Sequence, residues 1–273
     1  MSLYSYQIVL LSFNHPDLTE KSVRSVLNLN FPASQLLLVH NGSSEKNILV
    51  LKENFKNIQH LVLAHNIGFS GGANAGIHFA LKQTNAVFFL TNDTEMISLP
   101  TSFDSAFFSP LIMKRNTGQI DSLLGVINTR SATLKHVRAL DEAFEIHEVP
   151  YAPGTAFGIS RDCFQQLQGF DESYHTYWED VDLGFRAHLK NIKLVHDERF
   201  QLKHKIGKTC HKDRFYTLYL FQRNRKRFMQ KQNLLNPVFF LKYSKDMAKL
   251  FLRICVKAKP SGPLKLWWKA IYD

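Results

Sequence analysis

Apolar segments alternate with helical patterns over the first hundred residues, and this alternation restricts the fold more than any other feature of the sequence. Residues 6–13 form a continuous apolar run, which is typical of a strand buried on both faces. Shorter apolar runs follow at 36–39, 60–64 and 86–90, and helical patterns lie between the first and second runs and before the last. Strands separated by helices predict a parallel sheet with right-handed crossovers.

Polar side chains follow each of these four predicted strands. The residues concerned are Asn14, His40-Asn41, His65-Asn66 and Asn92-Asp93. Ligands of open parallel sheets bind beyond the carboxyl ends of the strands, where these side chains meet. The sequence therefore predicts one shared polar pocket at this edge of the sheet.

A glycine-rich stretch at residues 66–76 allows two interpretations. It is not a P-loop, because no Gly-Lys-Ser/Thr follows. It is not the dinucleotide fingerprint either, because that motif directly follows the first strand, where Ser12–His15 holds no glycine. The stretch is either a flexible loop with a helix cap or a place where backbone closely approaches a ligand.

Aromatic side chains and carboxylates crowd together at residues 174–183, in a loop that leads into a helix. Three carboxylates, Glu179, Asp180 and Asp182, follow Trp178 closely. Apolar rings near a carboxylate raise its pKa, which suits a general base. An acidic helix N-terminus favoured by the helix dipole explains the same pattern without chemistry.

The cysteine content and the apolar segments exclude several protein classes. Cys163, Cys210 and Cys255 are far apart and odd in number, so a disulfide framework and a zinc knuckle are both excluded, and we expect free thiols in the cytoplasm. Residues 1–6 have no signal-peptide pattern, and no apolar run reaches the length of a membrane-spanning helix.

Positive charge is concentrated in the last quarter of the chain. Residues 199–273 carry 19 Lys and Arg against 3 Asp and Glu, whereas the whole chain has a net charge of +11. Residues 214–229 and 237–254 read as amphipathic helices with basic faces, and Trp267-Trp268 suits an interfacial anchor. We expect peripheral association with an anionic membrane; packing on the rest of the protein is the alternative. No nucleic-acid motif is present.

Six segments, taken in order, resemble the family 2 inverting glycosyltransferases of the GT-A fold, especially the rhamnosyltransferase-like branch. They are VLLSFNHPDLTEKSVRSVL, LLLVHNGSS, HNIGFSGGANAGI, FFLTNDT, GFDESYHTYWEDVDLGFR and FQLKH. The resemblance runs from about residue 7 to about 210, with a poor match near 98–147. It implies a Rossmann-like, mostly parallel central sheet flanked by helices over residues 1–212. Residues 213–273 would form a basic helical appendage, packed on the domain or associated with a membrane.

The resemblance also implies a nucleotide-sugar donor, a divalent metal (Mg²⁺ or Mn²⁺) and a glycan or lipid-linked acceptor. Asp93 would bind the metal and His204 would complete its site. Asp180 of the Glu179-Asp180 pair would be the catalytic base, with Trp178 beside the acceptor or the sugar. The donor-binding positions would be Phe13, Asn14, His40, Asn41, Asn66, Gly68, Phe69, Gly71, Gly72, Asn74 and Asn92.

These residue types fit the chemistry of an inverting transfer. The base takes the proton of the acceptor hydroxyl as its oxygen attacks the anomeric carbon, and a metal neutralises the departing diphosphate. His40 departs from the family pattern, which has an Asp here that contacts the pyrimidine ring. This departure leaves open a second function, that of a non-catalytic relative that binds a nucleotide-sugar or a glycan or docks on membranes. A nucleotidyltransferase is a weaker third interpretation, because no basic glycine-rich loop follows the first predicted strand.

Overall fold

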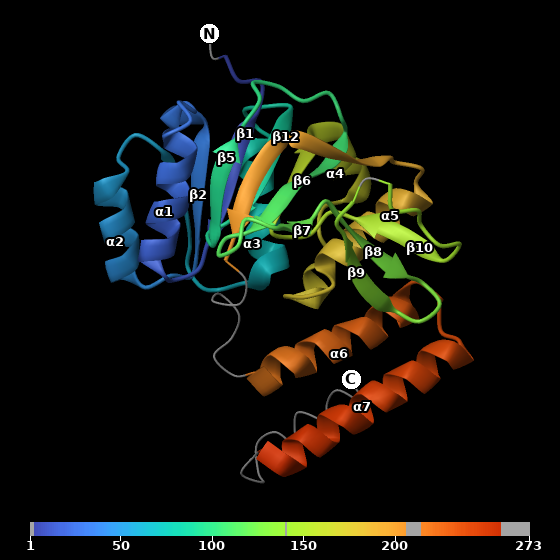
Figure 1. The fold of residues 1–273 in the computed structure, drawn as a ribbon. Helices are drawn as coiled ribbons and strands as arrows, with labels where there is room; N and C mark the ends of the chain where they lie inside the picture. Colours follow the sequence, from blue (N-terminus) through green and yellow to red (C-terminus); the bar gives the residue numbers. More distant parts are fainter. Residues whose placement is uncertain (1–2, 140, 206–213, 258–273) are drawn as a thin grey trace.

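The chain folds as a central mixed sheet covered by helices, with two long helices packed beneath one end (Figure 1). The computed structural model describes residues 3–139, 141–205 and 214–257. The main sheet has the strand order β3-β2-β1-β4-β11-β6-β12-β5, and β7 pairs with β6. Its strands are β1 (Gln7–Ser12), β2 (Leu36–Asn41), β3 (Gln59–Leu63), β4 (Ala86–Thr91), β5 (Thr94–Ser98), β6 (Phe107–Lys114), β7 (Ile120–Ser122), β11 (Ala156–Ser160) and β12 (Leu194–His204).

The parallel part of the sheet is its N-terminal half, as the sequence predicts. β1 pairs in parallel with β2 and β4, and β2 with β3. The other half is mixed, since β11 runs antiparallel to β4 and β6, and β12 antiparallel to β5. The helices are α1 (Pro16–Leu27), α2 (Glu45–Asn54), α3 (Gly68–Ala80), α4 (Arg161–Leu167) and α5 (Glu179–Leu189).

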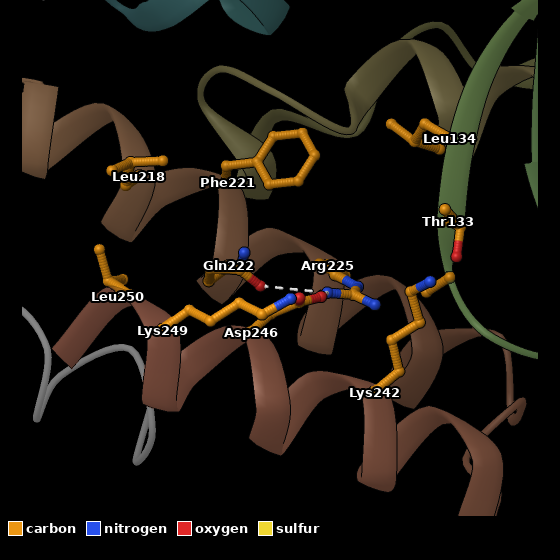
Figure 2. Close-up of a pocket in the computed structure, with 11 residues that line it drawn as sticks. Thr133, Leu134, Leu218, Phe221, Gln222, Arg225, Lys242, Asp246, Lys249 and Leu250 are labelled. Atoms are coloured by element: carbon orange, nitrogen blue, oxygen red, sulfur yellow. Dashed lines mark hydrogen bonds and ion pairs between the residues drawn. The ribbon is translucent and has the colours of Figure 1, made fainter. Parts of the chain in front are cut away.

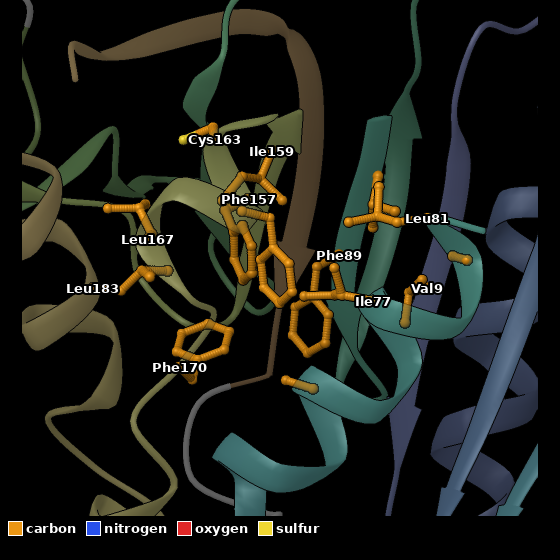
Figure 3. Packing of buried hydrophobic residues seen from close by; sticks show 14 of the residues in the cluster. Val9, Ile77, Leu81, Phe89, Phe157, Ile159, Cys163, Leu167, Phe170 and Leu183 are labelled. Carbon is orange, nitrogen blue, oxygen red and sulfur yellow. The ribbon is translucent and has the colours of Figure 1, made fainter. Parts of the chain in front are cut away.

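Two apolar cores, one on each face of the sheet, explain why β1 is apolar at every position. Val9 and Leu11 pack with Ile77 of α3, whereas Ile8 and Leu10 pack with Val23 of α1 and its neighbours. The first core continues across Phe89, Phe157 and Phe170 to the start of α5 (Figure 3). This core therefore joins the predicted donor half of the molecule to α5, the helix that carries the predicted base.

The stretch near 98–147 that matches the family poorly supplies β6, β7 and most of a second, smaller sheet. That sheet has the order β10-β8-β9 and consists of β8 (Leu124–Asn128), β9 (Thr133–Val137) and β10 (Glu148–Tyr151). Ile127, Val149 and Tyr151 of this sheet enter a third core with residues of α5, α6 (Arg214–Lys231) and α7 (Pro237–Lys257).

The basic C-terminal segment packs on the rest of the protein through one face of each helix (Figure 1). Leu220, Phe228 and Met229 of α6 and Phe239 of α7 are fully buried or nearly so. The outer side of α7 is exposed and mixes Phe240, Leu241 and Leu252 with lysines. No helix in the described part of the chain is long and apolar enough to cross a membrane. Cys210, Cys255 and Trp267-Trp268 lie outside what the structure describes of the side chains.

Candidate active site

Asp93 lies in the two-residue turn between β4 and β5, at the carboxyl end of the parallel strands. The carboxylate is 6% exposed, and its Oδ1 accepts a hydrogen bond from the Thr91 hydroxyl at 2.7 Å. Its Oδ2 lies 3.5 Å from Nε2 of His204. The antiparallel pairing of His204 with Thr94 holds the histidine at this position, because β12 ends beside the start of β5.

The structure thus brings together the two residues that the sequence predicted as metal ligands. A carboxylate oxygen and an imidazole nitrogen are a donor set that suits Mn²⁺, and Mg²⁺ accepts it with more oxygen ligands. In residues 3–139, 141–205 and 214–257, no group of three His, Cys, Asp or Glu side chains forms a metal cluster.

A short turn at Gly154 and Thr155 connects the Asp93 region to Asp180. The Thr155 carbonyl accepts hydrogen bonds from the Thr91 amide at 3.0 Å and from the Thr91 hydroxyl at 3.3 Å. The adjacent Gly154 amide donates to Oδ2 of Asp180 at 2.9 Å. Gly154 therefore bonds Asp180 directly, and Thr155 reaches Asp93 only through Thr91, whose hydroxyl bonds the Asp93 carboxylate.

Asp180 lies in the first turn of α5, where its Oδ1 also accepts from the Val181 amide at 2.8 Å. Burial raises the pKa of Asp180 above its usual range, although the bonds from Gly154 and Val181 act in the opposite direction. Neighbouring Glu179 is 5% exposed, and its Oε2 has no hydrogen-bond partner among the described residues. Burial, with the nearby Asp180 charge, raises the pKa of Glu179 well above its usual range.

The glycine-rich stretch begins α3 and packs closely on the loop before α5. A Cβ on Gly68, whose φ is +81°, would lie 2.3 Å from Nδ1 of His175. The Ser70 amide donates to the His175 carbonyl at 3.3 Å. A Cβ on Gly72 would lie 2.7 Å from Nδ2 of Asn41. The close backbone approach that the sequence suggested is therefore made to other parts of the protein itself, and Gly71 meets the side chain of Ile67 in the same way.

Several predicted donor-binding side chains hold loops at this edge of the sheet. Asn41 donates to the Gly68 carbonyl at 2.8 Å and accepts from the Ile67 amide at 3.1 Å, and Asn66 accepts from the Gly68 amide at 2.8 Å. Asn92 donates to the Thr19 hydroxyl at 3.0 Å.

Asn74 and Phe69 extend these contacts toward the loop before α5. The Asn74 amide exchanges hydrogen bonds with the backbone of Phe170 at 2.9 and 2.8 Å. Phe69 lies beside Gly154, since a Cβ there would meet its ring at 3.1 Å and Oδ2 of Asp180 at 3.5 Å. Of the predicted donor residues, Phe69 is therefore placed next to the predicted base.

Asn14 and Phe13 lie just beyond β1, and His40 is enclosed within β2. Asn14 has a φ of +53° and bonds the loop before α2 through Ser43 and Ser44, whereas the Phe13 side chain is 39% exposed. His40 is fully buried, and its Nε2 lies 2.9 Å from Nδ1 of His60. Burial lowers the pKa of His40 to about 4, so the ring is neutral near pH 7.

Trp178 is buried beneath α6. It is 2% exposed, its ring lies 5.6 Å from that of Phe221 and 5.4 Å from that of Phe228, and its φ is +74°. Its indole Nε1 has no hydrogen-bond partner in the part of the chain that the structure describes.

The sequence reasoning assigned no role to Asn224, Gly154 or Thr155. Nδ2 of Asn224, on α6, lies 2.9, 2.8 and 2.8 Å from the carbonyl oxygens of Tyr174, Thr176 and Tyr177. This fully buried amide fixes the loop in which His175, Tyr177 and Trp178 all have positive φ. In the sequence, Asn224 is a single Asn among the basic and aromatic residues of 214–229. Without an alignment, nothing distinguishes such an Asn from one at the surface.

Sequence comparisons connect this arrangement to known glycosyltransferases. The profile of the family described as Glycosyl transferase family 2 matches residues 7–98. The low-salt glycan biosynthesis hexosyltransferase Agl10 of Haloferax volcanii is 24% identical over 223 residues, which are 76% of this chain and 71% of Agl10. The O-antigen biosynthesis protein RfbC of Myxococcus xanthus is 24% identical over 217 residues, which are 70% of this chain but 16% of RfbC.

Solved structures agree in fold. The mannosyltransferase PcManGT of Pyrobaculum calidifontis, in complex with GDP-Man and Mn²⁺, has a TM-score of 0.57 at 11% identity, over 98% of this chain and 73% of that one. S. aureus TarS 1–349, in complex with UDP, has a TM-score of 0.56 at 11% identity, over 94% of this chain and 76% of that one. The architecture is the GT-A fold of glycosyltransferases. The chain is therefore similar in sequence to family 2 glycosyltransferases over residues 7–98, and its relatives and its fold support a glycosyltransferase.

Proposed function

We propose that the protein transfers a sugar, with inversion at the anomeric carbon, from a nucleotide-diphosphate donor to a hydroxyl of a glycan or glycolipid acceptor. The observation that carries this proposal is the turn at Gly154 and Thr155, which bonds Asp180 on one side and Thr91, the partner of Asp93, on the other. An inverting transfer needs a base on one face of the sugar and charge stabilisation at the leaving group on the other face. Two carboxylates held on either side of one turn suit these two tasks.

Asp180 is the residue we assign as base. Its carboxylate accepts two backbone N–H bonds that fix its orientation, and its raised pKa increases its basicity toward the acceptor hydroxyl. Glu179 is buried beside it, and burial together with the Asp180 charge raises the pKa of Glu179, which disfavours a second negative charge next to the base.

Asp93 and His204 are the residues that would hold a divalent metal, Mn²⁺ or Mg²⁺. When bound, the metal would supply charge neutralisation to the departing diphosphate. The Thr91 hydroxyl orients the Asp93 carboxylate, and the β5–β12 pairing keeps the imidazole beside it. PcManGT was solved with Mn²⁺ and GDP-Man, and TarS with UDP, which supports a metal and a nucleotide-sugar here.

The donor proposed is dTDP-rhamnose or a UDP-sugar, and the acceptor a cell-envelope or lipopolysaccharide-type glycan. Agl10 and RfbC are named for glycan and O-antigen biosynthesis, which supports this class of acceptor. Asn41, Asn66 and Asn92 order the loops at the strand ends where the donor would lie.

Attachment to the inner face of the cytoplasmic membrane is the location we propose for this activity. The exposed side of α7 carries Leu241 and Leu252, which are both 62% exposed, together with Lys245 and Lys249. Apolar and cationic side chains on one helix surface suit the interface of an anionic membrane.

The test is a thermal-shift screen of UDP-, dTDP-, GDP- and CMP-sugars with and without Mn²⁺ or Mg²⁺, followed by NMR of the anomeric configuration of the product. We expect one donor to raise the melting temperature in a metal-dependent way and the product to have the inverted configuration. A retained configuration would contradict the assignment of Asp180 as base. Absence of a shift with every donor would favour a non-catalytic glycan-binding or membrane-docking relative, and would make His40 the residue to change to Asp.

A further inference from the structure

A cavity of about 430 Å³ lies between α6, α7 and β9, apart from the strand-end site (Figure 2). One part of its lining is apolar and comes from Leu134 of β9, Leu218 and Phe221 of α6, and Leu250 of α7. The other part is polar and comes mainly from Arg225, Lys242, Asp246 and Lys249. The cavity therefore presents cations and an apolar wall to the same occupant.

The charges in this lining are not balanced within the described residues. Arg225 donates to Oδ2 of Asp246 at 2.8 Å, which accounts for the one carboxylate of the lining. Neither Lys242 nor Lys249 has an ion-pair partner among the residues that the structure describes. The lining therefore keeps two unneutralised positive charges.

Arg225 is the buried cation of this lining. Its side chain is 4% exposed, its guanidinium lies 5.7 Å from the ring of Phe239, and its other terminal nitrogen donates to the Ser131 carbonyl at 2.9 Å. Its Nε is buried without a hydrogen-bond acceptor in the described part of the chain. A buried cationic N–H group without an acceptor is costly, and it adds to the positive charge of this wall of the cavity.

The lining of the cavity also contacts the loop before α5. The ring of Phe221, which lines the cavity, packs against the ring of Trp178 at 5.6 Å. Trp178 immediately precedes Glu179 and Asp180. A molecule held here would therefore contact a side chain that packs on Trp178.

We propose that this cavity binds an anionic lipid, with the phosphate at Lys242 and Lys249 and the first carbons of the chain against Leu134, Leu218 and Leu250. A phosphate pairs with ammonium and guanidinium groups, and an aliphatic chain suits the leucines. Two sources share this chemistry: a phospholipid of the bilayer and the lipid phosphate that carries a glycan acceptor. That the lipid phosphate carries a glycan acceptor rests on the sugar transfer proposed above. That the cavity binds an anionic lipid does not depend on it.

The test is isothermal titration calorimetry of the full chain with geranyl phosphate, without donor or metal. Inorganic phosphate and geraniol are the two half-ligands. Lys249→Glu is compared with Lys245→Glu, a matched change one turn away on the same helix at an exposed lysine that does not line the cavity. We expect saturable binding of geranyl phosphate, at least tenfold weaker binding of either half-ligand, and about tenfold weakening by Lys249→Glu only.

A second arm, sedimentation with vesicles of phosphatidylcholine containing phosphatidylglycerol, separates the two sources. If the bilayer supplies the lipid, Lys249→Glu loses more vesicle binding than Lys245→Glu; if the acceptor supplies it, the two variants lose the same amount. Absence of saturable binding of geranyl phosphate, or equal weakening by the two variants in calorimetry, would overturn the proposal. Because no donor is present, failure of sugar transfer would leave this result unaffected.

Discussion

The side-chain amide nitrogen of Asn224 lies 2.8 Å from the carbonyl oxygen of Tyr177, which is three residues before Asp180 and 47 residues before Asn224 itself. A helix of the basic C-terminal segment thus holds the backbone that leads into α5. The same nitrogen reaches the carbonyls of Tyr174 and Thr176, so one buried amide organises the whole turn. The conformation around the predicted base depends on a residue outside the predicted catalytic domain.

Asn224→Ala should lower kcat more than it raises the KM for the donor. The change leaves buried carbonyls without their donor, which costs about 2 kcal/mol of folding free energy, and it frees the positive-φ loop before Asp180. We expect kcat to fall tenfold or more while the donor KM stays within about twofold. Gln230→Ala, at an exposed amide on the same helix, is the control for steady-state kinetics and thermal unfolding. Wild-type kcat in Asn224→Ala would show that the loop does not need this contact.

Asp180→Asn should reduce turnover by about 10³-fold and leave donor binding unchanged, because the amide has no basic lone pair for the acceptor proton. In the wild-type enzyme, the base must be ionised to act, and burial raises its pKa. Activity should therefore be lost as the pH falls through a pKa above 3.8, the ordinary value for Asp. The measurement is kcat/KM as a function of pH, with donor affinity determined separately. Near-normal turnover in Asp180→Asn would refute the assignment.

Asp93→Asn and His204→Ala should each remove the Mn²⁺-dependent part of the stabilisation by the donor. A donor at a hundredfold its Kd adds about 3 kcal/mol to the free energy of unfolding, and this amount should fall toward the metal-free value. His147→Ala, at an exposed histidine remote from Asp93 in the sequence, is the control. The measurement is the melting temperature with donor, with and without Mn²⁺. An unchanged metal response in both variants would exclude this pair as ligands.

His40 should make the fold sensitive to mild acid. Its folded-state pKa, lowered by burial to about 4 from 6.5, means that the unfolded chain binds the proton more tightly. The free energy of unfolding should therefore decrease as the pH falls from about 6.5 to 4, with His40 contributing up to roughly 3 kcal/mol. His40→Leu, which matches Leu36 and Leu38 on the same strand face, should flatten this dependence, whereas the exposed His65→Ala should not. Denaturant titrations at several pH values check this, and parallel curves for wild type and His40→Leu would disagree with it.

Local patterns predicted the N-terminal half of the molecule well. The apolar runs at 6–13, 36–39 and 86–90 correspond to β1, β2 and β4, and their parallel pairing is confirmed. Such runs are informative because a strand buried on both faces tolerates few polar residues. The resemblance to family 2 glycosyltransferases and the GT-A fold is likewise confirmed, whereas the rhamnosyltransferase-like branch stays a prediction.

The second half depends on contacts that no local pattern contains. β11 and β12 pair with β4 and β5, which lie far earlier in the chain, so their positions follow from long-range pairing. The nearness of His204 to Asp93 results from that pairing, and spacing in the sequence gives no sign of it. Trp178 was expected beside the acceptor or the sugar, and the structure places its ring under α6. The domain boundary between residues 212 and 213 and the roles of the individual site residues remain predictions.

The hydrogen bonds from Asn224 of α6 to the loop before α5 limit how this protein can be recombined with a relative. The C-terminal helices are not an interchangeable module, because a transplanted pair would have to supply an amide at the position of Asn224 and an aromatic surface for Trp178. A chimera joined near residue 212 would therefore inherit the loop before α5 without the contacts that support it. Crossovers that carry residues 171–189 together with 214–250 keep both halves of the contact from one parent.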